Sequence, residues 1–274
     1  MFRFFMVAVL ISLTSWGISA QTTPAIEQAV PEEVAAAPAG TTAPETHKLN
    51  SPAKKVVLYM LDEFKKMSAS RQRYLDGKQS HADYMKKDKS MAEEVSTTID
   101  FYDVVEKSLK YDYDAKNKKF RKDHWAGKKP EDRKYFVSLF RQLIEEIVYP
   151  IANEFFGDLE MRHEVLEVKS DYVHVKTMVR NVKKKKKRND EFIVDWYLHP
   201  KAEGGWIIYD IGVEGERWVP GFRSQFNDVI TQKSYKELVN MMKKKLKETK
   251  EDRLDKDKKD RIKAKNKTTE KKEN

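Results

Sequence analysis

The chain has 274 residues, of which 39% are hydrophobic and 36% are charged, and its mean hydropathy is -0.77. This length suits one large domain or two small ones, and the charged fraction exceeds the roughly one quarter that is usual in globular proteins. The composition is not that of an integral membrane protein, and we expect part of the chain to be solvated. The absence of cysteine excludes disulfide bonds, thiolate nucleophiles and cysteine-ligated metal clusters.

The net charge of +10 is concentrated in two places. Residues 243–274 contain 15 basic and 8 acidic side chains, and Lys183–Arg188 is an unbroken run of six cations. Residues 51–242 contain 37 basic and 32 acidic side chains, so without the run this part has a net charge of -1. A nearly neutral body argues against nucleic acid as a partner.

The N-terminus indicates the compartment. In residues 1–20, Arg3 precedes an apolar stretch that ends with small residues at Ala20, a pattern that predicts a cleaved secretory signal peptide. The alternative, a membrane anchor, needs about 20 apolar residues, and this stretch is shorter and interrupted by residues such as Ser12. A secreted chain without cysteine fits a bacterial periplasm better than an oxidising eukaryotic secretory route. Residues 21–50, rich in Ala, Pro and Thr, should form a flexible spacer.

Helices are expected at both ends of the folded part, where apolar residues recur at steps of three and four. The strongest pattern begins after Pro130, and Pro150 should kink or end that helix near Tyr149. The expected helical segments begin at Pro52 and include 91–98, 101–109, the segment after Pro130, 221–231 and 234–247.

Strands are expected between these helices, because after Gly157 the apolar residues alternate with period two. Short turns join them, which predicts an antiparallel meander with the Lys183–Arg188 run at a hairpin tip. The expected strands are 160–168, 171–182, 191–199 and 206–213. The predicted fold class is therefore α+β, with helices packed on a sheet of about four strands. The folded domain should span residues 51–248, followed by a charged, solvated tail at 249–274 that is helical or disordered.

No sequence motif argues for catalysis. The six histidines lack metal-ligand spacing, and no nucleophile elbow or phosphate-binding loop is present. Asp195, Tyr197, His199 and Asp210 lie on expected strands, where they form either cross-strand surface pairs or an acid/base site in a concave sheet. We favour the surface pairs.

The body is rich in aromatic and aliphatic residues for its size. One interface between helices and sheet would absorb them as a dry core, and composition alone favours that interpretation. A concave sheet would instead leave an apolar cavity for a ligand. Composition does not decide between the two.

Several segments together resemble the MlaC family, also called toluene-tolerance auxiliary proteins. The most specific segments lie near the C-terminal end of the body and are Trp206 through Tyr209-Asp210, Val213-Glu-Gly215 and Phe222-Arg-Ser-Gln-Phe226. The family is also resembled by three earlier segments, which are Phe101–Leu109, His124-Trp125 and Pro130-Glu-Asp-Arg133 with Phe136 and Phe140. The resemblance covers about residues 54–248. The chain departs from the family at Gly215-Glu216-Arg217, where Gly-Val-Ser is usual, and in its lysine run, spacer and tail.

This resemblance implies a nuclear-transport-factor-like fold with a curved sheet, enclosing an apolar cavity between helices and sheet. It further implies a periplasmic phospholipid carrier that shuttles lipid between an outer-membrane lipoprotein complex and an inner-membrane ABC transporter complex, maintaining outer-membrane lipid asymmetry. Bound phospholipid would be cargo, with no cofactor or metal. The segment Lys183–Arg188 is either a solvated turn or a site of transient contact with an anionic membrane surface or an acidic partner.

Our leading hypothesis is therefore a non-enzymatic phospholipid carrier. Enclosing lipid tails needs large apolar side chains, and the residues expected to line the tails are Phe101, Trp125, Phe136, Phe140, Leu143, Val175, Val179, Val194, Trp196, Ile208, Trp218 and Phe226. The alternative is an enzyme on the same scaffold that uses Asp195, His199 or Asp210 as acid or base on an apolar substrate. A third hypothesis is an interaction module whose basic tail binds an anionic polymer.

Overall fold

A computed structural model describes residues 51–109, 112–114, 119–121, 125, 127–156, 159–169, 171–181 and 191–273. The expected signal peptide, the expected spacer and the run Lys183–Arg188 lie outside these residues. None of the helices that the structure describes contains a stretch long and apolar enough to cross a membrane.

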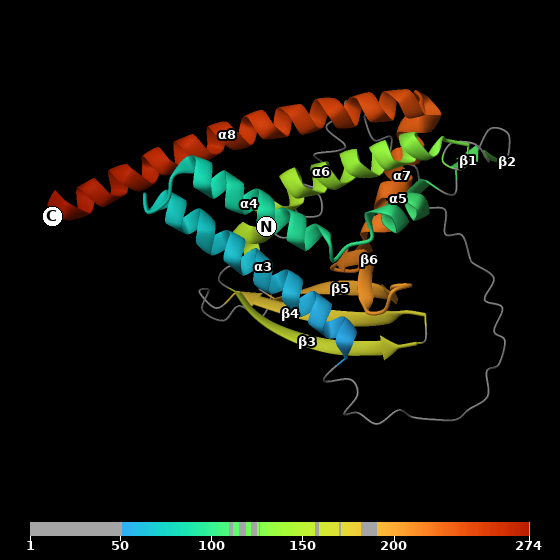
Figure 1. The fold of residues 1–274 in the computed structure, drawn as a ribbon, viewed down its shortest axis with the longest axis horizontal. Helices are drawn as coiled ribbons and strands as arrows, with labels where there is room; N and C mark the ends of the chain where they lie inside the picture. Colours follow the sequence, from blue (N-terminus) through green and yellow to red (C-terminus); the bar gives the residue numbers. More distant parts are fainter. Residues whose placement is uncertain are drawn as a thin grey trace.

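Helices and a sheet form separate layers (Figure 1). In chain order the elements are α3 (Pro52–Leu75), α4 (His81–Ser96), α5 (Phe101–Leu109), β1 (Asp112–Asp114), β2 (Lys119–Arg121), α6 (Pro130–Phe156), β3 (Leu159–Val168), β4 (Val173–Asn181), β5 (Glu191–Pro200), β6 (Trp206–Val213), β7 (Glu216–Arg217), α7 (Trp218–Gln232) and α8 (Tyr235–Glu273). The α+β prediction is confirmed.

The main sheet is an antiparallel meander with strand order β3-β4-β5-β6-β7. Its four long strands begin and end within two residues of the expected ones, because alternation of apolar and polar residues marks a half-buried strand directly. The two-residue strand β7 was not expected. It forms because Glu214 and Gly215 have φ of 53° and 86°, and positive φ at both central positions is typical of the tight hairpin turn that returns the chain onto β6.

One face of the sheet is buried against the helices. Val175, Val194 and Trp196 are at most 2% exposed, and Val175 pairs with Trp196 across β4 and β5. Helix α3 contacts β4 and β6, and α7 contacts β6. A single hydrophobic core therefore extends from the sheet into the helical layer.

Helix α6 does not end at Tyr149 but continues through Pro150 to Phe156. Proline removes one main-chain hydrogen bond from a helix, and contacts of the preceding residue, Tyr149, hold the helix at this point. The Tyr149 ring packs edge-on against Phe64 with centroids 5.4 Å apart, and its hydroxyl lies 3.1 Å from the Ser96 hydroxyl. Packing thus outweighs the lost bond.

Helix α8 has 39 residues and runs through position 249 without a break. Beyond that position Arg253 pairs with Asp88 of α4 and with Glu146 of α6, the latter at 3.0 Å. One turn later Asp257 is 2% exposed, and Arg71 of α3 contacts Asp260 at 2.8 Å. The sequence prediction of a solvated segment from residue 249 did not include these contacts, because they join charged residues that carry no apolar periodicity.

Candidate functional site

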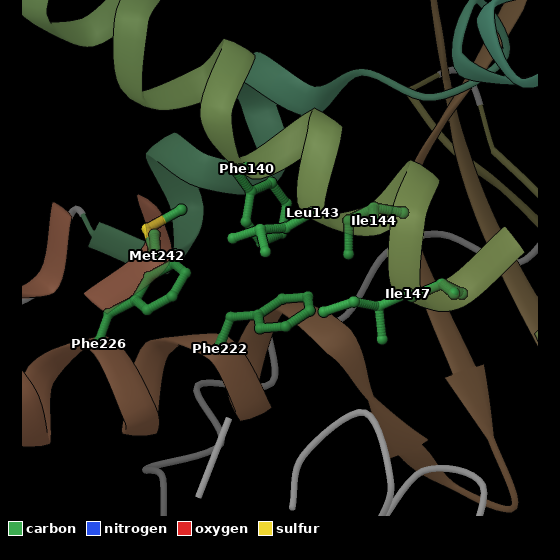
Figure 2. Close-up of a pocket in the computed structure, with 8 residues that line it drawn as sticks. Phe140, Leu143, Ile144, Ile147, Phe222, Phe226 and Met242 are labelled. Atoms are coloured by element: carbon green, nitrogen blue, oxygen red, sulfur yellow. The ribbon is translucent and has the colours of Figure 1, made fainter. Parts of the chain in front are cut away.

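A pocket of about 330 Å³, counting the space open at its mouth, lies between α6, α7 and α8. Figure 2 shows side chains of α6 facing those of α7 across this space, with Met242 of α8 at one end. Its lining is formed by Phe140, Leu143, Ile144, Ile147, Val148, Phe222, Phe226 and Met242.

Helical spacing places these side chains together. On α6 the lining residues recur from Phe140 to Ile147 at steps of three, one and three, so they share one helix face. On α7 Phe222 and Phe226 are four residues apart, so they lie on the same helix face about one turn from each other. The Phe140 and Phe222 rings meet edge-on with centroids 4.9 Å apart, and Phe226 stacks on Phe222 at 5.8 Å. These three rings, one from α6 and two from α7, thus form an aromatic cluster that borders the pocket.

The chemistry of the pocket is uniform, because every lining residue is apolar. No lining side chain offers a charge or a strong hydrogen bond, so a bound group gains mainly from leaving water, at about 25 cal/mol per Å² of apolar surface. Met242 adds a flexible, polarisable wall that adapts to irregular shapes. The arrangement suits hydrocarbon chains.

The sequence-predicted lining residues separate into two groups. Phe140, Leu143 and Phe226 line the pocket. The others are buried in the same core without lining this pocket, and they are Phe101, Trp125, Phe136, Val175, Val179, Val194, Trp196, Ile208 and Trp218. The pocket therefore lies between helices, whereas the resemblance implied a cavity between helices and sheet.

Some members of the second group pack against the residues that line the pocket or against their neighbours. Phe136 packs edge-on against Phe226 with centroids 5.8 Å apart, and Trp125 packs against Phe136 at the same separation. Phe101 meets Phe140 at 6.2 Å. The role of this group as lipid-contacting residues stays a prediction.

Five lining residues were not among those predicted, namely Ile144, Ile147, Val148, Phe222 and Met242. Each belongs to an apolar stripe or aromatic segment that is visible in the sequence. Periodicity identifies a buried helix face, but which part of that face borders an open space depends on how three helices meet.

The acid/base candidates lie elsewhere and serve other contacts. Asp210 is 1% exposed, and its carboxylate accepts hydrogen bonds from the N–H groups of Ile211 at 2.9 Å and Val219 at 3.0 Å and from Arg217 at 2.8 Å. Burial raises the pKa of Asp210, although the Val219 N–H and Arg217 act in the opposite direction. Asp210 thus fastens the start of α7 to β6.

Asp195 and His199 lie on the face of β5 opposite Trp196 and the core. Asp195 contacts His174 Nε2 at 2.8 Å, and His199 Nε2 lies 3.4 Å from Asp100. Neither side chain lines the apolar pocket. Within the described residues no group of three or more His, Asp or Glu side chains gathers as a metal site would require.

Comparisons with known proteins agree with this geometry. A family model described as MlaC protein matches residues 77–244, whereas no curated protein matches the chain in sequence. The fold is similar to that of the phospholipid-binding protein from Ralstonia solanacearum, solved in complex with a phospholipid, with a TM-score of 0.54 and 15% identity over 72% of this chain and 98% of that one. Because the family model spans more than half of the chain, this protein belongs to the MlaC family.

Proposed function

We propose that this protein is a carrier that binds phospholipid tails in the pocket between α6, α7 and α8. The observation that carries the proposal is the wholly apolar lining of that pocket in a chain of the MlaC family. The bound phospholipid of the structurally similar Ralstonia protein supports it. Moving a two-chain lipid through water exposes some 30 methylene groups at about 0.8 kcal/mol each, so a carrier must enclose the tails.

The pocket must widen to do this. The space of about 330 Å³ includes the open mouth of the pocket, so the enclosed part is smaller than the roughly 300–1,000 Å³ that holds a drug-sized ligand, and a phospholipid is larger still. Met242 in this lining adapts its shape readily, whereas Ile144, Ile147 and Val148 are stiff at χ1, so rotamer changes alone widen the pocket little. We propose that α7 and α8 move apart from α6 as the tails enter.

The cellular role that we propose follows the family. The protein would carry phospholipid through the periplasm between an outer-membrane lipoprotein complex and an inner-membrane ABC transporter complex, and so maintain the lipid asymmetry of the outer membrane. Its function would be binding and delivery, without catalysis, because Asp195, His199 and Asp210 are engaged in pairs away from the pocket.

A tryptophan inside the pocket tests this proposal. Ile147 and Val137 are both partly buried residues of α6 that pack against the core, but only Ile147 lines the pocket. We expect Ile147→Trp to reduce the uptake of fluorescent phospholipid from vesicles severalfold, because the indole fills the space that the tails need. Val137→Trp is the matched control and should take up lipid like the unmodified protein.

The result is interpretable only for folded variants, so thermal unfolding of both is measured first. Equal uptake by the two variants would contradict a lipid site in this pocket. Reduced uptake by Ile147→Trp alone would support it.

A further inference from the structure

One face of α8 carries a row of exposed lysines. Helical geometry, at about 100° per residue, places them within a strip about 80° wide, and Leu254, which is 38% exposed, lies in its middle. We define this row as the basic stripe, formed by Lys243, Lys247, Lys250, Lys258 and Lys265, all of them exposed. Glu251 borders the stripe, and Lys258 lies 3.9 Å from the exposed Asp255.

The other faces of α8 have a different character. Toward the body, Arg253 pairs with Asp88 and Glu146, and Asp260 pairs with Arg71. The remaining outer side, which we define as the mixed face, carries both signs of charge and contains Lys245, Glu248, Asp252, Asp255, Lys259 and Lys263. The stripe therefore consists of lysines with one acidic neighbour, Glu251, at its border, whereas lysines and acidic residues occur together on the mixed face.

The basic stripe is long and lies at an outer edge of the molecule. From Lys243 to Lys265 the helix rises by about 33 Å, at 1.5 Å per residue, and in Figure 1 α8 lies along the edge of the helical layer farthest from the sheet. The ion pairs of Arg253 hold the helix to α4 and α6 near the middle of this length. The same helix supplies Met242 to the pocket, as Figure 2 shows.

We propose that the basic stripe docks α8 onto the anionic surface of a lipid bilayer, with Leu254 entering the headgroup region. A straight row of cations with one apolar residue matches a flat anionic surface more closely than it matches a protein, which would need an acidic row of equal length. Basic helices with exposed apolar residues bind such interfaces. The contact would bring the pocket close to its lipid source, and this purpose rests on the proposed function. The docking itself needs no lipid in the pocket.

The test compares two triple variants of the full chain. The stripe variant is K247Q/K250Q/K258Q, and the control variant is K245Q/K259Q/K263Q on the mixed face, which removes the same charge from the same helix. Co-sedimentation is measured with vesicles of phosphatidylethanolamine containing phosphatidylglycerol and with vesicles of phosphatidylcholine, over a salt series. Each lysine near an anionic surface is worth about 1 kcal/mol, a factor of about five, so the stripe variant should bind anionic vesicles about 100-fold more weakly at low salt.

We expect the control variant to lose much less affinity, and the three proteins to converge as salt shortens the Debye length toward about 8 Å. Equal losses in both variants would show that net charge alone acts and would overturn the proposal. No binding of the unmodified protein to anionic vesicles would also overturn it and would leave an acidic protein as the partner of the stripe. Solvent extraction of each protein before it meets the vesicles reports pocket lipid separately, so lipid-loaded protein that fails to dock would contradict the docking and not the carrier function.

Discussion

Among single residues, Thr177 organises the buried polar contacts of the sheet. It is completely buried, its hydroxyl oxygen accepts a hydrogen bond from Trp196 Nε1 at 2.8 Å, and it lies 3.0 Å from His163 Nδ1. A neutral imidazole suits this arrangement, because its Nδ1 can accept the hydroxyl hydrogen of Thr177. Burial lowers the pKa of His163 to about 4, and Lys54 and Lys65 act in the same direction.

This lowered pKa predicts a pH dependence of stability. A histidine whose pKa is lower in the folded than in the unfolded chain contributes stability above the unfolded value of 6.5 and loses that contribution as pH falls toward about 4. We therefore expect the free energy of unfolding to fall more steeply between these two pH values for the unmodified protein than for His163→Gln. Urea unfolding at a series of pH values measures this, and parallel curves for the two proteins would contradict it.

At the scale of elements, the attachment of α8 depends on Arg253. Its guanidinium is 13% exposed and pairs with Asp88, whose side chain is 5% exposed. Burial alone would lower the pKa of Arg253, but Asp88, Tyr84 and Glu146 outweigh it and raise the value. The charged form is therefore held firmly, and its removal would leave Asp88 as a buried charge without its arginine.

We expect Arg253→Met to destabilise the fold by about 3–5 kcal/mol, the usual cost of breaking a buried ion pair from one side. Lys259→Met is the control, because it removes an exposed cation of the same helix and should change stability by about 0.5 kcal/mol or less. Adding Asp88→Asn to Arg253→Met should recover part of the loss. Chemical denaturation measures all of these, and additive losses in the double variant would contradict a direct pairing. Removing residues 250–274 also removes Arg253, so we expect the truncated protein to be less stable than the full chain. Met242, which lines the pocket, is still present in the truncated protein.

The elements differ in how well sequence patterns predict them. The strands were predicted closely because alternation depends only on one face being buried, as in Val173 through Val179 of β4. The length of α8 was not predicted, because Arg253 and Asp257 are buried through pairing and not through apolar character. The sequence left open whether Pro150 kinks or ends α6, and contacts of Tyr149 with distant residues accompany its continuation.

At the scale of the whole molecule, the fold converts an excess of aromatic and aliphatic residues into both a core and a pocket. The sequence alone does not distinguish core residues from pocket-lining residues, because Phe136 and Phe140 lie on the same face of α6 and only Phe140 borders the open space. A pocket arises where three helices meet without filling the space between them, which is a property of packing and not of any one segment.

If the protein is a lipid carrier, the purified protein should contain bound lipid. The most direct measurement is solvent extraction followed by mass spectrometry of protein purified from a bacterial periplasm without detergent. We predict that phospholipid co-purifies with the protein, because apolar walls such as those of Phe222 and Met242 favour hydrocarbon over water. Finding no phospholipid in the extract, together with no uptake of lipid from vesicles, would contradict the account.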